Sequence, residues 1–324
     1  GTLTDITRFV SHRTRNPFIS LPTAPSVDGY ASIGAPLVLG GVKQTVIGQP
    51  PLAILADLPT LQAAPRPLIA AGVGDMVGKI TSLADWELGH LLGDEPYDET
   101  IARRARNGLR ACLDQIEAIA AGDQTGIHHL MDGLIESGLC MLAFGDSRPA
   151  SGAEHHSSHY WEMMLLQGNR PPILHGAKVG LATTLVADRY ARLRAMSRVE
   201  MGRRLKAATP PDRAQEIAAI RAAYGPVAET VIAAQARFLN MTAADFARLK
   251  QRILDRWEAI QAIAAAVPPG EAIAGLLRRV GAPTSGPAVG LSEDEVRRGL
   301  LYGHYLRDRL TILKLFHLLG LEVI

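Results

Sequence analysis

The pattern of apolar positions changes near residue 66 of the 324-residue chain. Before this point, apolar and β-branched residues form short runs between glycines and prolines. Such runs are typical of β-strands. We therefore predict a helix at about residues 5–12, followed by short strands at FISL (18–21), PLVLG (36–40), QTVIG (44–48) and LAILAD (52–57).

From Pro67 onward, apolar residues recur every three or four positions and alanine is abundant. This spacing places apolar residues on one face of an α-helix. Glycine and proline, which are disfavoured inside helices, separate the periodic segments. The predicted helices span residues 67–90, 98–121, 126–144, 153–167, 175–196, 211–223, 226–239, 242–265, 270–279, 292–302 and 304–319.

The two patterns predict an α/β part at residues 1–66 and a large all-α domain at residues 67–324. Short strands with a single helix cannot form a parallel sheet that is covered on both faces. We therefore expect the α/β part to be truncated at its N-terminus, with further sequence preceding Gly1.

Composition narrows the class of protein. The chain has 34 basic and 32 acidic side chains and a formal charge of +2, without a block of like charges. This balance gives no reason to expect a nucleic-acid partner. Cys112 and Cys140 lie in apolar helical sequence and are predicted to be buried thiols in a reducing cytoplasm. We found no apolar run near the roughly 20 residues of a membrane span and no secretory signal pattern.

Three histidines occur within five positions of the segment SGAEHHSSHYWE. On a helix, His155 and His159 share one face, whereas His156 is turned away by about 100°. Two imidazoles one turn apart can approach a single divalent metal ion. The alternative is a polar helix start, with Ser151 as N-cap and Glu154 completing a capping box. The two interpretations are compatible.

Two other segments add candidate ligands. GVGDMVGK places Asp75 inside an apolar helix with Lys79 one turn later; the alternative is an ordinary ion pair within the helix. ILHGAKVG begins a helix with His175, a position where histidine is more often solvated or capping. One aspartate and two histidines from three helices would form a metal site that leaves coordination positions open for a substrate.

These three segments, in this order, resemble the iron-containing alcohol dehydrogenase and dehydroquinate synthase superfamily. The resemblance implies a dehydroquinate synthase-like architecture, in which a metal lies between a nucleotide-binding domain and a helical domain. It also implies that Asp75, His155 and His175 hold one divalent ion, zinc or nickel. His159 would then line the site and relay protons.

The loop LPTAPSVDGYAS resembles a signature of the sn-glycerol-1-phosphate dehydrogenases, and YLRDRLTIL resembles their C-terminal helix. Prolines exclude a regular strand or helix from this loop, and Thr23 and Ser26 offer hydroxyl groups to a diphosphate or ribose. The alternative is a turn in which Ser26 and Asp28 bond to their own backbone. By resemblance, Thr23 and Ser26 contact the nicotinamide cofactor, and Asp28 lies near the nicotinamide and the substrate.

The opening residues GTLTD resemble the end of the family's glycine-rich turn. In that turn, backbone N–H groups at a helix N-terminus meet the cofactor diphosphate. Gly1, Thr2 and Asp5 are the positions that match, and the resemblance assigns them to cofactor binding.

The resemblance implies reduction of dihydroxyacetone phosphate to sn-glycerol 1-phosphate by NAD(H) or NADP(H), with the metal as Lewis acid on the carbonyl oxygen. It implies catalytic and substrate contacts from Asp28, Lys79 and His159. Lys79 would hold the phosphate, with Arg307 or Arg309 as further candidates. We expect a cytoplasmic homo-oligomer, such as a homodimer, that serves phospholipid biosynthesis.

Three alternatives stay open at this point. The first is a glycerol or other polyol dehydrogenase on the same scaffold. The second is a phosphate lyase of the dehydroquinate synthase type. Asp75 argues against this alternative, because that family has a glutamate at this position. The third is a non-catalytic helical binding module.

Overall fold

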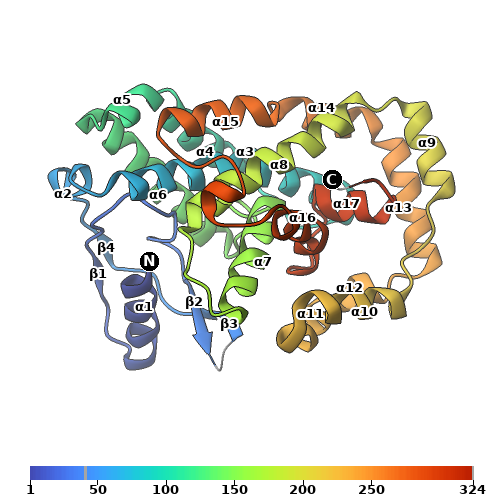
Figure 1. Cartoon of the computed structure of the whole chain (residues 1–324), viewed down its shortest axis with the longest axis horizontal. Coiled ribbons are helices and arrows are strands. Elements are labelled where there is room, and N and C mark those ends of the chain that lie inside the picture. Colours follow the sequence, from blue (N-terminus) through green and yellow to red (C-terminus); the bar gives the residue numbers. More distant parts are fainter. Residues whose placement is uncertain (40–41, 323–324) are drawn as a thin grey trace.

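The computed structural model describes residues 1–39 and 42–322. Its helices pack into an elongated body, with the strands near one end (Figure 1). The body is built from α3 (Arg66–Gly93), α4 (Glu99–Leu113), α5 (Ile116–Ala121), α6 (Gln124–Phe144), α7 (Ala153–Gln167), α8 (His175–Ala195), α9 (Arg198–Ala207), α10 (Arg213–Tyr224), α11 (Ala228–Ala234), α12 (Ala236–Leu239), α13 (Ala243–Asp255), α14 (Trp257–Ala266), α15 (Gly270–Arg279), α16 (Glu293–Tyr302) and α17 (Ile312–Leu318). Short 3₁₀ turns occur at η1 (Gly225–Val227), η2 (Pro287–Val289) and η3 (Gly303–Tyr305).

The N-terminal part contains helices and paired strands. Strand β1 pairs in parallel with β4, with Ile19 opposite Ala53. Strands β2 and β3 form an antiparallel pair, with Gly34 opposite Ile47. The elements of this part are α1 (Thr2–Thr14), β1 (Ile19–Ser20), β2 (Gly34–Leu39), β3 (Val42–Ile47), β4 (Ala53–Ile54) and α2 (Leu58–Gln62).

An α/β part followed by a large helical domain confirms the predicted fold class. Helix α3 begins at Arg66, beside the predicted boundary, although the division into two domains itself stays a prediction. Helices α7 and α15 have the predicted bounds. Cys112 and Cys140 are buried and free, as expected. Gly40, which ends the predicted strand PLVLG, lies outside the described residues.

Helix α9 is absent from the predicted set. Only Met201 and Leu205 of this helix are buried, so its apolar stripe is too short to reveal a helical period. Its start is fixed locally, because the Ser197 side chain accepts a hydrogen bond from the Glu200 N–H. Three predicted helices are also each divided by a short break, between α4 and α5, between α11 and α12, and between α13 and α14.

The last predicted helix, 304–319, is wrong over its first half. Residues 306–311 are irregular, and α17 begins only at Ile312. The N–H groups of Leu310 and Ile312 donate to the carboxylates of Glu95 and Asp85 at 2.6 and 2.7 Å. These contacts with distant residues replace the local hydrogen bonds that the sequence pattern predicts.

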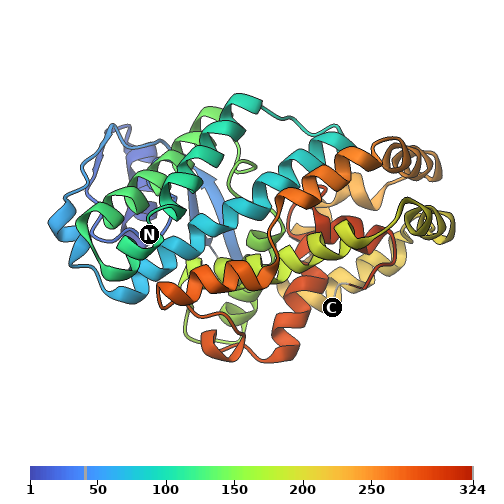
Figure 2. The same cartoon turned by 90° about the horizontal axis from the view of Figure 1, so that it is seen from above.

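Helix α3 runs through the middle of the molecule (Figure 2) and packs against α4, α6, α7 and α8. Its contact with α8 is backbone to backbone, because a Cβ atom on Gly74 would lie 2.1 Å from the Gly176 carbonyl oxygen. A Cβ atom on Gly176 would lie 1.7 Å from the Ala71 carbonyl oxygen. The two glycines therefore allow the start of α8 to touch α3 at Asp75.

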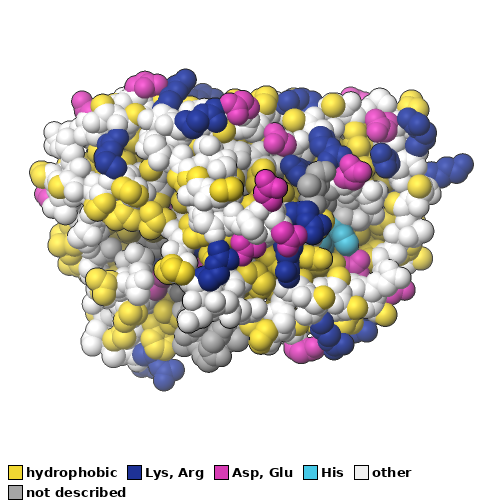
Figure 3. Space-filling model, viewed as in Figure 1, with side chains coloured by type: hydrophobic (Ala, Val, Ile, Leu, Met, Phe, Trp, Pro, Cys, Tyr) yellow, Lys and Arg dark blue, Asp and Glu magenta, His cyan; other side chains and the backbone are white. Residues whose placement is uncertain are grey.

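Apolar side chains are exposed on the N-terminal part. Leu3, Ile6 and Val10 share one face of α1, and Leu3 is 81% exposed. Apolar side chains gather on the side of the molecule that carries α1, β1 and β4 (Figure 3), whereas basic and acidic side chains are interspersed over the rest of this view. Contiguous apolar surface of this kind is unusual on an isolated domain.

Two helical stretches, Arg213–Ala234 and Trp257–Arg279, have the length and apolar composition of a membrane span. The sequence-based search for apolar runs did not detect them. Core helices have the same composition, and 33% and 44% of the most apolar 18 residues of the two stretches are buried inside the fold. A turn at η1 interrupts the first stretch, and the segment between α14 and α15 interrupts the second. They are weak evidence for a membrane protein.

Candidate metal centre

Asp75, His155 and His175 converge from α3, α7 and α8, as the sequence predicts. The Asp75 Oδ1 atom lies 3.3 Å from His155 Nε2 and 3.8 Å from His175 Nε2. One ligand atom from each residue lies within 4.8 Å of the others. The Asp75 side chain is fully buried, whereas that of His175 is 26% exposed, so solvent reaches the group from the His175 side.

This donor set fits a divalent metal ion. One carboxylate and two imidazoles are ligands that zinc, nickel and iron accept. Atoms at these separations are spaced like two ligands that each lie about 2.1 Å from one ion. Burial alone would raise the pKa of Asp75, but Lys79 and the two imidazoles hold it well below its usual range. Asp75 is therefore ionised and able to bind a cation.

Glu154 fixes the orientation of His155. Its Oε1 atom lies 2.8 Å from His155 Nδ1 and accepts the Gly152 N–H at 2.7 Å. Its Oε2 atom accepts the Thr81 hydroxyl at 2.7 Å. Burial raises the pKa of Glu154, but these hydrogen bonds lower it below its ordinary value. An ionised Glu154 holds the ring proton on Nδ1 and leaves the Nε2 lone pair for a metal.

The predicted cap of α7 is wrong. Gly152, not Ser151, is the N-cap residue, and the first helical N–H, that of Ala153, donates to Asp85 Oδ2 at 2.7 Å. Glu154 does bond the N-cap N–H, but it sits at the second helical position and directs the same oxygen to His155. The polar helix start therefore also serves the candidate metal centre.

We expect Glu154→Gln to weaken metal binding by about 10- to 100-fold, the usual cost of losing a residue that orients a metal ligand. An amide cannot accept all the hydrogen bonds that the carboxylate accepts. The measurement is competitive titration with a metal chelator. Glu117→Gln, which removes an exposed carboxylate on α5, is the matched control and should bind metal as the parent does. Equal affinity of all three proteins would contradict the role of Glu154.

Lys79 lies one helical turn from Asp75 and is completely buried. Its Nζ atom lies 2.8 Å from Asp28 Oδ2, 3.5 Å from Asp75 Oδ1 and 3.2 Å from the Ala150 carbonyl oxygen. Burial lowers the pKa of Lys79, but Asp28 and Asp75 outweigh that effect and raise it. All three ammonium hydrogens have protein acceptors. Binding of a substrate phosphate by Lys79 stays a prediction, and it requires one of these contacts to break.

Asp28 connects the proline-rich loop to the candidate metal centre. Its backbone N–H donates to Asp75 Oδ2 at 2.9 Å, and its carboxylate accepts the Ser137 hydroxyl at 2.8 Å. A Cβ atom on Gly72 would lie 1.9 Å from the Pro25 carbonyl oxygen, so the loop touches α3 directly. These contacts fix the position of the loop relative to the Asp75 carboxylate.

His159 lies beside the three converging residues, on the exposed side. Its ring centre is 5.4 Å from that of His175, and its Nδ1 atom is 3.3 Å from Glu162 Oε2. Glu162 also pairs with Lys178 at 3.3 Å. His159, Glu162 and His175 form a second group whose ligand atoms lie within 4.8 Å of one another. His156 belongs to neither group, as its place on the helix predicts.

The residues predicted to bind the cofactor lie apart from the candidate metal ligands but are linked to them. Thr23 is exposed and Ser26 half-buried in the proline-rich loop. Gly1, Thr2 and Asp5 lie at the start of α1. Arg8 joins α1 to the strand end and the loop, because it donates to the carbonyl groups of Gly34 and Gly29 at 2.8 and 2.7 Å. Cofactor binding by these residues stays a prediction.

The sequence pattern predicts neither the pairing of Glu154 with His155 nor the contacts that Ser137, Arg8 and Gly176 make in the site. An acidic residue directly before a histidine ligand is a usable signal for the first. The others act through contacts between distant segments, and a single sequence carries no signal for them.

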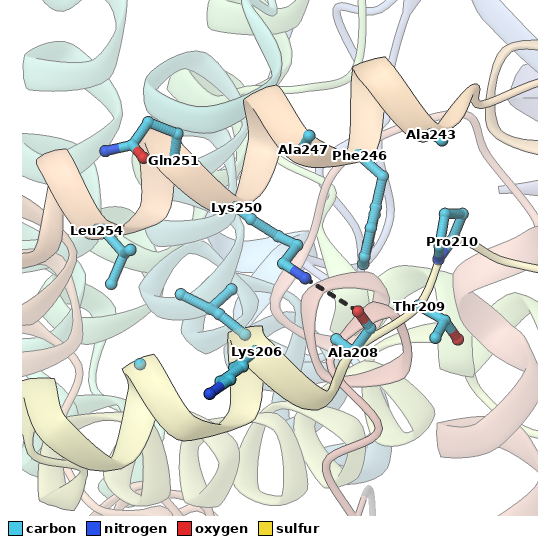
Figure 4. A pocket seen from close by; sticks show the side chains of 12 residues that line it. Lys206, Ala208, Thr209, Pro210, Ala243, Phe246, Ala247, Lys250, Gln251 and Leu254 are labelled. Carbon is cyan, nitrogen blue, oxygen red and sulfur yellow. Dashed lines mark hydrogen bonds between the residues drawn. The ribbon is translucent and has the colours of Figure 1, made fainter.

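A groove elsewhere on the surface contains none of the predicted site residues. It lies between the end of α9 and α13 and has a volume of about 470 Å³. Lys250 crosses it and donates to the Ala208 carbonyl at 3.0 Å (Figure 4). Its other walls are mainly aliphatic, so it offers none of the metal-ligating chemistry found around Asp75.

The fold resembles those of an iron-containing alcohol dehydrogenase and of a maleylacetate reductase. An iron-containing alcohol dehydrogenase from Corynebacterium glutamicum aligns with 100% of this chain and 72% of its own length, with a TM-score of 0.55 and 12% identity. Maleylacetate reductase from Agrobacterium tumefaciens aligns with 99% and 73%, with a TM-score of 0.53 and 15% identity. The family model for iron-containing alcohol dehydrogenases matches residues 1–65. The fold is therefore the one found in this class of enzymes.

Proteins with similar sequences show to which family within this class the chain belongs. Glycerol-1-phosphate dehydrogenase (NAD(P)+) from Bacillus subtilis is 41% identical over 98% of this chain and 68% of the relative. The same-named protein of Geobacillus stearothermophilus is 40% identical over 97% and 69%. That of Geobacillus thermodenitrificans is 53% identical over 60% of this chain and 48% of the relative. The chain belongs to the glycerol-1-phosphate dehydrogenase family of the iron-containing alcohol dehydrogenases. It spans 48% to 69% of the length of these three relatives.

Proposed function

We propose that this protein is a metal-dependent oxidoreductase that reduces dihydroxyacetone phosphate to sn-glycerol 1-phosphate with NADH or NADPH. The observation that carries the proposal is the convergence of Asp75, His155 and His175 in a chain whose relatives bear that enzyme's name. We further propose zinc or nickel as the metal, the cytoplasm as its location and a homo-oligomer as its assembly.

Asp75, His155 and His175 would hold the metal, and Glu154 would keep the Nε2 atom of His155 directed at it. When bound, a divalent ion at this position supplies Lewis-acid polarisation of a carbonyl oxygen. The nicotinamide supplies the hydride. Gly1, Thr2, Asp5, Thr23 and Ser26 would bind this cofactor, through backbone N–H groups at the start of α1 and hydroxyl groups of the loop.

His159 would deliver a proton to the product oxygen. Its side chain is 21% exposed, so it can exchange protons with water, and histidine is the side chain that most often acts as a general acid or base. Asp28 would line the substrate position and keep the loop bonded to Asp75. Lys79 would neutralise the carboxylates of Asp28 and Asp75 and hold them in place.

The test of this proposal is elemental analysis of the full-length protein together with reduction assays on dihydroxyacetone phosphate and on dihydroxyacetone. We expect one divalent ion per chain and a kcat/KM for the phosphorylated ketone at least 10²-fold higher, since a site built for a polar group rejects the analogue that lacks it. Equal use of the two ketones would favour a polyol dehydrogenase. Phosphate release from a heptulosonate phosphate would favour a lyase, and failure to bind metal or nicotinamide would favour a binding module.

Replacement of Lys79 separates two roles for this residue. If Lys79 positions the two carboxylates, Lys79→Ala should lower kcat about 10²-fold with both ketones, because small displacements of reacting groups cost that much. If Lys79 holds the phosphate, KM should rise for the phosphorylated ketone alone. We expect the first result, because every ammonium hydrogen already has an acceptor. Lys206→Ala, at an exposed lysine on α9, is the control.

A further inference from the structure

A second group of buried polar side chains lies on a different face of α7 from the candidate metal centre. We call it the α7–η3–α17 cluster and define it as His156, Gln235, His304 and Lys314. The turn η3 contacts both α7 and α17. Each of the four side chains is at most 3% exposed.

The cluster has more hydrogen-bond donors than acceptors. Both ring nitrogens of His156, both of His304 and the Nε2 atom of Gln235 have no partner among the described residues. Lys314 Nζ donates to Gln235 Oε1, which leaves two of its N–H groups without an acceptor in the described part of the chain. Each neutral imidazole adds one donor and one acceptor, while the Gln235 amide adds donors only. Buried donors of this kind require acceptors.

The cluster also carries a positive charge without a counter-ion. Burial lowers the pKa of Lys314 to about 8, so the ammonium group is mainly protonated at neutral pH. Asp308, Glu95 and Glu216 oppose this shift, but none of them forms an ion pair with Lys314 within the described residues. Glu216 is instead bonded to His317 and Tyr305. The centre of the Phe238 ring lies 4.6 Å from Lys314 Nζ and offers a cation–π contact, but a buried charge without an ionic partner is still costly.

Lys314 contacts Gln235 directly, and His304 lies close enough to Lys314 and His156 to feel their charges. The His304 ring lies 4.4 Å from that of His317, which is one turn after Lys314 on α17. Burial and the charges of His317, Lys314 and His156 together lower the pKa of His304 well below its ordinary value. A Cβ atom on Gly303 would lie 2.9 Å from the Ser157 nitrogen, so η3 touches α7 directly beside His156.

We propose that the α7–η3–α17 cluster binds one small oxyanion of the phosphate class. Lys314 provides the counter-charge, and Gln235, His156 and His304 donate N–H groups to its oxygens. An oxyanion supplies both the acceptors and the negative charge that the cluster lacks. Water supplies donors and acceptors in equal number and no charge. The oxyanion is either a free phosphate ion or the phosphate group of a small substrate, and binding of inorganic phosphate does not depend on the function proposed above.

The test is thermal unfolding and calorimetry of the full-length protein with inorganic phosphate, in a buffer without other oxyanions. We expect phosphate to raise the Tm of the parent, of Lys206→Met and of Asp75→Asn, in which the metal centre is impaired. Lys314→Met and His304→Leu should bind phosphate at least tenfold more weakly. Each variant is compared with its own phosphate-free Tm, so a loss of intrinsic stability does not obscure the result.

A kinetic comparison separates the two sources of the oxyanion. If the cluster holds the substrate's phosphate, Lys314→Met raises KM for dihydroxyacetone phosphate and leaves KM for dihydroxyacetone unchanged. If it holds a free ion, both KM values stay unchanged while phosphate binding is lost. The proposal is overturned if phosphate does not raise the Tm of the parent, or raises that of Lys314→Met equally. The thermal measurement needs no catalysis, so its failure is distinct from failure of the proposed reaction.

Discussion

Replacement of Asp75 by asparagine should remove the metal from the protein and lower kcat by about 10³-fold, because several kcal/mol of charge stabilisation depend on the ion. The Asp75 Oδ1 atom faces both imidazoles and Lys79, so a neutral amide there removes the negative charge that attracts the metal and leaves the Lys79 ammonium, which repels it. The measurement is the metal content of the purified protein, combined with initial rates on dihydroxyacetone phosphate.

Asp132→Asn is the matched control for this experiment. Asp132 lies on α6, where its exposed side chain pairs with His128, and its replacement should leave both metal content and rate unchanged. If Asp75→Asn keeps one metal ion per chain with the affinity of the parent, the assignment of Asp75 as a ligand is wrong.

Gly176→Ala is expected to have the second large effect. The added Cβ atom would lie 1.7 Å from the Ala71 carbonyl oxygen, so the first turn of α8 must move away from α3. We expect a loss of about 3 kcal/mol in the free energy of unfolding, the upper end of the range for overpacking. Because His175 directly precedes this glycine, metal affinity should fall as well. Urea denaturation and chelator competition measure the two effects.

The control for Gly176→Ala is Gly202→Ala. Gly202 lies on α9, and a Cβ atom there meets nothing within 4 Å. Alanine should stabilise this helix by up to about 1 kcal/mol, the usual gain over glycine. If both substitutions have the same effect, the close contact between α3 and α8 is not what holds His175 beside Asp75.

The convergence of the three candidate metal ligands was predictable because each lies in a segment with a local signal. His155 and His159 are four residues apart, Asp75 is an isolated charge in an apolar helix, and His175 begins a helix. The resemblance then selected His155 over His159 as the ligand. The structure brings Asp75 together with His155 and His175 and leaves His159 beside them.

Other features required contacts that no single segment encodes. The early end of the last predicted helix depends on Glu95 and Asp85, which lie more than 200 residues earlier and accept the N–H groups of Leu310 and Ile312. The three acceptors of Lys79 come from three separate segments. Sequence spacing identified Lys79 as a candidate site residue. It did not show which groups surround the Lys79 side chain.

The connection between the N-terminal part and the candidate metal centre is equally nonlocal. Arg8 on α1 binds the backbone at Gly29 and Gly34, and the N–H group of Asp28 in the same loop binds Asp75. A cofactor held at α1 and the loop would therefore be joined to the metal ligand by a short chain of hydrogen bonds. This arrangement is the physical basis for placing the proposed hydride transfer next to the proposed metal.

Anomalous diffraction from crystals of the full-length protein, recorded at the absorption edge of the metal found by elemental analysis, tests the central claim most directly. The account predicts one peak at about 2.0–2.2 Å from Asp75 Oδ1, His155 Nε2 and His175 Nε2. A map without a peak among these atoms, or with its peak between His159 and Glu162 instead, would contradict it.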